Sequence, residues 1–165
     1  MTFTATDSRN ARTDSWLTPI PLVRKLGHFD LDPCGYPGHP TAERLITLPN
    51  DGLVEPWTGR VWLNPPYGRE AGKWLNKLMK HGDGIALVFN RLDTKWLAPY
   101  LRDGFFAING RIQFIPTQGQ DASQPGTGSI LIPFGYRNRA AIIKSEIKGI
   151  WFNAGWAYGI DEAWK

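Results

Sequence analysis

The sequence contains little cysteine: Cys34 is the only one among 165 residues. A single cysteine excludes an intrachain disulfide and a zinc site built from several cysteines, so nothing here indicates an oxidising compartment. Long hydrophobic runs are also missing, since no apolar stretch reaches the roughly 20 residues of a membrane-spanning helix. Residues 1–15 are polar and unlike a signal peptide. We therefore expect a cytoplasmic protein with no membrane contact and no resident metal.

The sequence also has only a small excess of positive charge. Lysine and arginine number 19 against 15 acidic residues, which gives a net charge of +4. This balance is compatible with a polyanionic partner but does not require one. The length suits one hydrophobic core and is too short for two. We expect a flexible tail over residues 1–15 and a single domain over residues 16–165, with no obligate protein partner.

Strand-like and helix-like patterns alternate along the chain. Thr18 followed by Pro19 has the form of a helix N-cap with proline at the first helical position. Further helices are predicted over 69–80, from Thr94 to Leu101 and over 140–147. Strands are predicted over 28–32, 44–48, 60–63, 84–89 and 129–134, with a final aromatic segment from Trp151. Alternation of this kind is typical of an α/β sheet covered by helices.

Asn109-Gly110 is the strongest hairpin signal in the chain, and it predicts that residues 105–108 pair with residues 112–115. Residues 116–128 are rich in Gly, Gln, Pro, Ser and Thr. Such a composition predicts an exposed loop.

The segment Asn64-Pro65-Pro66-Tyr67 directly follows an apolar strand. An exocyclic amino group on an aromatic base is a poor nucleophile, because its lone pair is delocalised into the ring. The Asn64 side-chain oxygen and the Pro65 carbonyl can accept both amino protons and aim the nitrogen at an electrophilic methyl group. The two prolines make this turn rigid, and Tyr67 offers a face for stacking a base. The alternative is an ordinary Pro-Pro turn with a packing tyrosine.

This motif is the catalytic motif of amino-group methyltransferases, and the sequence resembles the phage-type Dam-like DNA adenine methyltransferases. The resemblance extends from Trp16 to about Phe152. Its ordered blocks are Trp16-Leu17-Thr18-Pro19, Phe29-Asp30-Leu31-Asp32-Pro33-Cys34, Asp51-Gly52-Leu53, Trp62-Leu63-Asn64-Pro65-Pro66-Tyr67 and Gly110-Arg111-Ile112. It implies methyl transfer from S-adenosylmethionine to the exocyclic amino group of adenine in DNA, inside a bacterial host cell.

The resemblance also implies a Rossmann-like fold with the cofactor at the carboxyl ends of the strands. Thr18 and Pro19 would approach the carboxylate of S-adenosylmethionine. The segment Asp32-Pro33-Cys34 would form the first cofactor loop, with Asp32 at the ammonium group. Asp51 would accept from the adenine amine of the cofactor, and Asn64 would border the methyl group. The alternatives are a helix cap at Thr18 and ordinary turn residues at Asp32 and Asp51.

One departure from the usual methyltransferase pattern concerns the first cofactor helix. Asp32 and Asn64 are only 32 positions apart, and a Gly-x-Gly loop with a long helix is missing after Asp32. Parallel crossovers usually need a dozen residues or more each. The sequence therefore predicts a fold that is reduced around the first cofactor loop and helix.

Basic side chains near the motif are candidates for DNA contact. They are Arg69, Arg91, Lys95 and Arg111, together with Lys73, Lys77 and Lys80 on the predicted helix and a basic set from Arg137 to Lys148. The alternative is a solvated charged face. The loop over residues 116–128 is the candidate for reading bases.

Two other functions fit the same pattern. Asn-Pro-Pro-Tyr also serves enzymes that methylate RNA bases or glutamine amides in proteins. A non-catalytic methyltransferase-like protein that binds nucleic acid is the second alternative.

Overall fold

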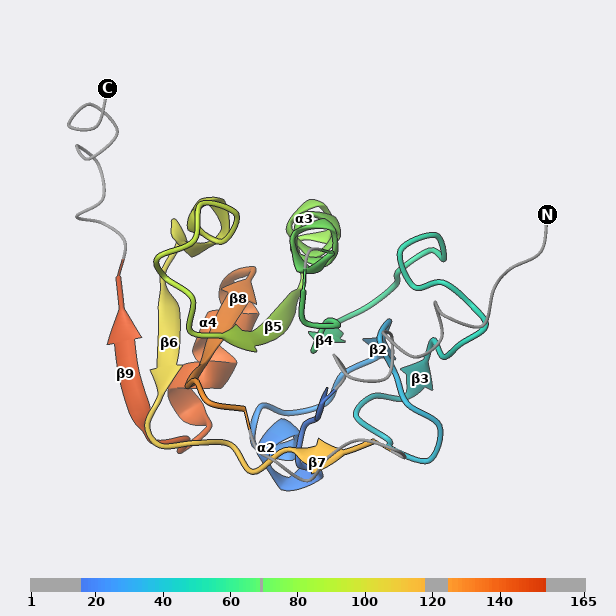
Figure 1. The fold of residues 1–165 in the computed structure, drawn as a ribbon, viewed down its shortest axis with the longest axis horizontal. Helices are drawn as coiled ribbons and strands as arrows, with labels where there is room; N and C mark the ends of the chain where they lie inside the picture. Colours follow the sequence, from blue (N-terminus) through green and yellow to red (C-terminus); the bar gives the residue numbers. More distant parts are fainter. Residues whose placement is uncertain (1–15, 69, 118–124, 154–165) are drawn as a thin grey trace.

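A mixed sheet of seven strands runs through the protein (Figure 1). This computed structural model describes residues 16–68, 70–117 and 125–153. The strand order is β3 (Arg44–Leu45), β2 (Leu31–Asp32), β4 (Val61–Leu63), β5 (Gly84–Phe89), β8 (Ser129–Phe134), β6 (Phe105–Ile108) and β9 (Gly149–Phe152). The tail predicted over residues 1–15 lies outside the described residues, as do residues 154–165. The predicted mixture of helix and sheet is confirmed.

One half of this sheet is parallel and the other is antiparallel. β2 runs parallel to both β3 and β4, and β4 runs parallel to β5. β8 is antiparallel to β5 and β6, and β9 is antiparallel to β6. The chain moves outward from β2 to β3 and then returns to the other side of β2 to form β4. The direction of winding therefore reverses between β2 and β4.

Helices cover both faces of the sheet. The helix α3 (Ala71–His81) and the 3-10 helix η1 (Ala98–Leu101) lie over one face, and α2 (Ile20–Lys25) and α4 (Tyr136–Lys144) lie over the other (Figure 1). Side chains alternate between the two layers, since Val61 and Leu63 pack with α3 while Trp62 packs with α2 and α4. No helix in the described part of the chain is long and apolar enough to span a bilayer.

The predicted hairpin around Asn109-Gly110 is wrong. Gly110 does turn the chain with a φ of +83°, but both edges of β6 are taken by β8 and β9. Ile112 and Phe114 are instead buried in the core beneath the sheet. The strand β7 (Ile115–Pro116) pairs with β1 (Trp16–Leu17) in a separate two-stranded ribbon. Burial of apolar side chains thus overrides the local turn signal.

Other predicted elements are confirmed, several of them with different bounds. β5 and β8 have the predicted bounds, while β2, β3 and β4 are shorter than predicted. The predicted helix from Thr94 is reduced to η1, and α3 and α4 begin at residues 71 and 136. Thr18 is not the N-cap of α2, because Pro19 holds that position without a side-chain cap bond. The connection over residues 33–43 contains turns and no helix, as the short spacing predicted.

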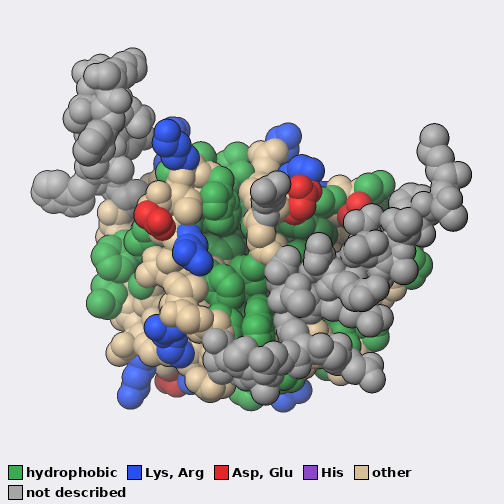
Figure 2. Space-filling model, viewed as in Figure 1, with side chains coloured by type: hydrophobic (Ala, Val, Ile, Leu, Met, Phe, Trp, Pro, Cys, Tyr) green, Lys and Arg blue, Asp and Glu red, His purple; other side chains and the backbone are tan. Residues whose placement is uncertain are grey.

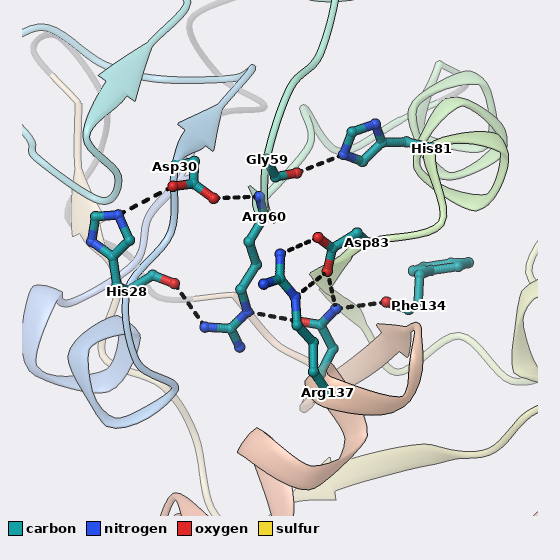
Figure 3. Close-up of polar contacts among 9 residues, drawn as sticks. His28, Asp30, Gly59, Arg60, His81, Asp83, Phe134 and Arg137 are labelled. Atoms are coloured by element: carbon teal, nitrogen blue, oxygen red, sulfur yellow. Dashed lines mark hydrogen bonds and ion pairs between the residues drawn. The ribbon is translucent and has the colours of Figure 1, made fainter.

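A polar network closes the edge of the sheet at the amino ends of β2, β4 and β5 (Figure 3). The Arg60 side chain is buried and lies 4.2 Å from the centre of the Phe29 ring. Its Nε donates to Asn138 Oδ1 at 2.7 Å, and one terminal nitrogen donates to the His28 carbonyl at 2.8 Å. Arg60 therefore ties β4 to α4 and to the segment after α2.

Further charged pairs lie at the same edge (Figure 3). Arg137 forms an ion pair with Asp83. His28 Nε2 lies 3.3 Å from Asp30 Oδ1 and 3.4 Å from Glu43 Oε2. Arg137 and Asp83 thus pair their charges at the amino ends of the strands, whereas the candidate site lies at the opposite, carboxyl ends.

Candidate active site

The reversal between β2 and β4 brings two predicted site segments together. Asp32 is the last residue of β2, and Asn64 directly follows β4, so both lie at the carboxyl ends of neighbouring parallel strands. In open α/β sheets such a reversal is where ligands commonly bind. The structure thus collects the predicted catalytic turn and the predicted first cofactor loop at one edge.

The Asn64 amide is held by three hydrogen bonds. Its Nδ2 donates to the Trp16 carbonyl and, at 3.2 Å, to Thr18 Oγ1. Its Oδ1 accepts from the Tyr67 hydroxyl at 2.8 Å. An asparagine amide offers two donor hydrogens and two acceptor lone pairs. The described contacts fill both donors and one acceptor, which leaves one lone pair on Oδ1.

These contacts also settle which atom of the amide is the oxygen. Turning the Asn64 amide over would place Oδ1 against the Trp16 carbonyl, and two acceptors cannot share a hydrogen bond. The same turn would remove the acceptor that faces the Tyr67 hydroxyl. The contacts therefore hold Oδ1 on the Tyr67 side.

Tyr67 belongs to an aromatic cluster at this edge. Its ring stacks on Phe89 with centroids 3.6 Å apart and an angle of 9° between the planes. Phe89 meets Phe114 edge-on, and Phe114 contacts Trp16. Burial raises the pKa of the Tyr67 hydroxyl, so this group stays protonated and acts as a donor. One face of the Tyr67 ring is thus covered by protein.

Phe89 was missed by the sequence analysis. It ends β5, the parallel neighbour of β4, so the carboxyl ends of these two strands lie side by side. The position of Phe89 at the end of a strand that neighbours β4 was the sequence signal that could have identified it. Pro65 is buried and Pro66 half-buried in the turn that leads to α3. Arg69 lies outside the described residues.

Asp32 is buried, with 4% of its surface exposed. Its Oδ1 accepts from the Cys34 amide at 2.9 Å, and its Oδ2 accepts from the Thr41 hydroxyl. Burial raises the pKa of Asp32 to about 6, although both hydrogen bonds oppose this. Burial, with the charges of Asp32 and Asp51, holds the pKa of the Cys34 thiol well above its usual range. Cys34 is therefore a neutral thiol.

Asp51 lies next to the predicted cofactor loop. Its exposed carboxylate accepts from the Leu53 amide at 2.8 Å. Gly52 packs so closely that a Cβ there would lie 2.0 Å from the Pro33 carbonyl oxygen. Only glycine permits this approach. The structure thus brings Asp51 beside the segment Pro33-Cys34.

Lys77 and Trp57 hold the turn that carries Asp51. Lys77 Nζ donates to the carbonyls of Gly52, Leu53 and Glu55 at 3.1, 2.8 and 2.6 Å. Trp57 Nε1 donates to the Gly52 carbonyl at 2.7 Å. An ammonium group has three donor hydrogens, so these carbonyls use all three donors of Lys77, and its contact with phosphate stays a prediction.

The remaining basic candidates are dispersed. Arg91 and Lys95 are exposed in the segment that follows β5. Arg111 donates to the Pro125 carbonyl at 3.1 Å. On the face seen in Figure 2, Lys and Arg side chains stand at separate points around hydrophobic side chains and do not form one patch. Of the candidate base-reading loop, residues 118–124 lie outside the described residues.

One comparison with known proteins bears on this site. The family model described as DNA N-6-adenine-methyltransferase (Dam) matches residues 5–149. The match includes all five ordered sequence blocks as well as the described turn, the Asp32 loop and the Asp51 turn. No curated protein and no solved structure matches the chain.

Proposed function

The chain belongs to the DNA N-6-adenine-methyltransferase (Dam) family, and from this membership we propose how its residues carry out the reaction. The protein methylates the N6 amino group of adenine in DNA. The turn Asn64–Tyr67 holds the target adenine, and S-adenosylmethionine binds at the carboxyl ends of β2 and β4. The rival acceptors, RNA and protein glutamine, and the non-catalytic alternative are not favoured by this membership.

The free lone pair on Asn64 Oδ1 carries this proposal. Both donors and the other acceptor position of the amide are occupied, so the position left open by the contacts of the described residues is an acceptor that suits an amino hydrogen of adenine. The Pro65 carbonyl accepts the second amino hydrogen. With both hydrogens held, the nitrogen lone pair is drawn out of conjugation and aimed in a fixed direction.

Tyr67 is the stacking platform for the adenine. An adenine inside a duplex must be flipped out before its amino group can be reached. One face of the Tyr67 ring is covered by Phe89, so the flipped base stacks on the other face. Base stacking on an aromatic side chain contributes about 1–3 kcal/mol. Phe89 packs against the covered face of the Tyr67 ring and keeps this ring in place.

The residues at the end of β2 fit a cationic cofactor. The buried Asp32 carboxylate has a raised pKa of about 6, and an ammonium group beside it would compensate its buried charge. Asp51 lies next to Pro33 and Cys34 and would accept from an adenine amine, and Pro19 borders the cofactor carboxylate. When bound, S-adenosylmethionine supplies an electrophilic methyl group. The reversal between β2 and β4 supports a Rossmann-like layout for this site.

No side chain is needed as a base, since the alkylated amine is a cation that is acidic enough to give its proton to water. Arg91 and Lys95 are exposed after β5 at the same edge, and we assign them to DNA phosphates. We assign Arg111, which donates to the Pro125 carbonyl, to DNA as well.

Replacement of Asn64 by alanine tests the proposal. We expect transfer of labelled methyl groups to DNA to fall by about 100-fold or more, the usual range for losing a group that orients a transition state. Asn109→Ala, an exposed asparagine at the end of β6, is the matched control and should leave the rate unchanged. Binding of S-adenosylhomocysteine, measured by calorimetry, confirms that each variant is folded. A folded Asn64→Ala variant with the original rate would refute the proposal.

A further inference from the structure

The chain segment ahead of α2 holds the Asn64 amide, and we infer that Trp16 and Thr18 are positioning residues that make an amide, not a carboxylate, necessary at position 64. This inference rests on the proposed function of Asn64. It assigns a task to β1, a strand that lies far from the catalytic turn in the sequence and contacts it in space.

The Trp16 carbonyl is available to Asn64 because of its partner in the ribbon. Trp16 faces Pro116 in the pairing of β1 with β7. Proline has no amide hydrogen, so Trp16 and Pro116 form a non-hydrogen-bonded pair, in which the Trp16 carbonyl points away from β7. That carbonyl accepts from Asn64 Nδ2 instead. A backbone carbonyl can only accept a hydrogen bond, so it demands a donor at this atom of residue 64.

Thr18 is a second hydrogen-bond partner of Asn64 Nδ2, and it is held in place by its own contacts. Its side chain is buried, and its Oγ1 lies 3.2 Å from Asn64 Nδ2. Its own carbonyl contacts His39 Nε2 at 2.8 Å. The segment is therefore held on one side by Asn64 and on the other by the loop that follows β2. Because Thr18 Oγ1 accepts from Asn64, we assign the hydroxyl to Asn64, and the Thr18 backbone and Pro19 to the border of the cofactor.

A carboxylate at position 64 would face one partner, the Trp16 carbonyl, that cannot donate a hydrogen bond to it. The Thr18 hydroxyl can rotate and donate to a carboxylate oxygen, but the Trp16 carbonyl would face that oxygen without a hydrogen between them. A protonated carboxyl group removes the conflict, because its O–H can donate to the Trp16 carbonyl while its other oxygen still accepts. The two forms should therefore differ in activity.

The first test is the pH dependence of Asn64→Asp. We expect the rate of this variant, divided by the wild-type rate at each pH, to rise as the pH falls from 9 to 6. The other titratable groups at this site in the described part of the chain are Tyr67, His39 and Asp32, and all three are present in the wild type, so the ratio removes their effect. A ratio that stays constant with pH would overturn the inference.

The second test separates positioning from cofactor binding. Thr18→Val keeps the shape and removes the hydroxyl, and we expect kcat to fall about tenfold, as for one lost hydrogen bond, with unchanged KM for cofactor and DNA. Thr18→Ser keeps the hydroxyl and should restore kcat. A raised KM for S-adenosylmethionine with unchanged kcat would instead assign the hydroxyl to the cofactor and overturn the inference.

Failure of the inference can be distinguished from failure of the proposed function. If Asn64→Ala is inactive while Thr18→Val matches the wild type in kcat, only the positioning role fails. If Asn64→Ala is fully active, the proposed function fails as well. Thermal unfolding of Thr18→Val, which should match that of the wild type within a few degrees, shows that a lower kcat does not come from loss of folded protein.

Discussion

Replacement of Asp32 by asparagine should stabilise the free protein and weaken cofactor binding. The Asp32 carboxylate is buried and accepts from the Cys34 amide and the Thr41 hydroxyl. Asparagine can keep both contacts, because its Oδ1 accepts from the same amide and its Nδ2 can donate to the Thr41 oxygen once that hydroxyl turns. The substitution therefore removes a buried charge and keeps both contacts.

The size of the effect follows from the pKa. Burial raises the pKa of Asp32 from 3.8 to about 6, and each pKa unit corresponds to about 1.4 kcal/mol. Between pH 4 and 6 the folded protein binds a proton that the unfolded chain does not, so wild-type stability falls as the pH rises through this window. Above pH 6 the full cost of about 3 kcal/mol is present, and it is an upper bound on the gain from Asp32→Asn.

Urea unfolding at pH 5, 6, 7 and 8 measures this gain. We expect the free energy of unfolding of Asp32→Asn to exceed that of the wild type at pH 7 and 8, with a smaller difference at pH 5. Calorimetry with S-adenosylhomocysteine should show binding that is at least tenfold weaker, because the ammonium group loses its carboxylate partner. Asp51→Asn, at an exposed carboxylate, is the matched control and should not be stabilised. A difference that is independent of pH, or a destabilised Asp32→Asn, would refute the reasoning.

Three further predictions concern Tyr67, Lys77 and Asp83. Tyr67→Phe keeps the stacked ring and should lower kcat on DNA by less than about tenfold, whereas Tyr67→Ala should lower it by about 100-fold; equal losses would contradict separate roles for ring and hydroxyl. Lys77→Met leaves the Leu53 and Glu55 carbonyls without their donor and should raise KM for the cofactor with little change in kcat; a raised KM for DNA alone would contradict this. Burial raises the pKa of Asp83, but hydrogen bonds from Arg137 and Asn138 lower it more. Its stabilising contribution is therefore present above about pH 4 and lost below it, so the Tm of Asp83→Asn should lie below the wild-type Tm at pH 7 and approach it near pH 3.

The parts of the fold that the sequence predicts best are those decided locally. β5 and β8 are continuous apolar runs bounded by turn residues, and both were predicted with their bounds. β2 and β3 have two residues each, and such strands exist only because of the neighbours that they pair with. The segment at Ile112 illustrates the same limit, since an Asn-Gly turn cannot reveal that both edges of β6 are already taken.

The residues of the candidate site likewise divide into those that the sequence predicts and those that it does not. Asn64 to Tyr67 form one contiguous motif whose chemistry is legible from the residue types alone. The Trp16 carbonyl, Phe89 and Lys77 reach the site through pairing and packing between distant segments. A backbone carbonyl in particular leaves no trace in a sequence, because every residue carries one.

The helix α3 connects the turn that ends at Tyr67 with the turn that carries Asp51. It begins shortly after the turn that ends at Tyr67, and one side chain from its middle, Lys77, grips the turn that carries Asp51. A movement of α3 along its axis would therefore displace the Asn64–Tyr67 turn and the Asp51 turn together. In the proposed function, this helix would keep the distance between the target adenine and the cofactor constant.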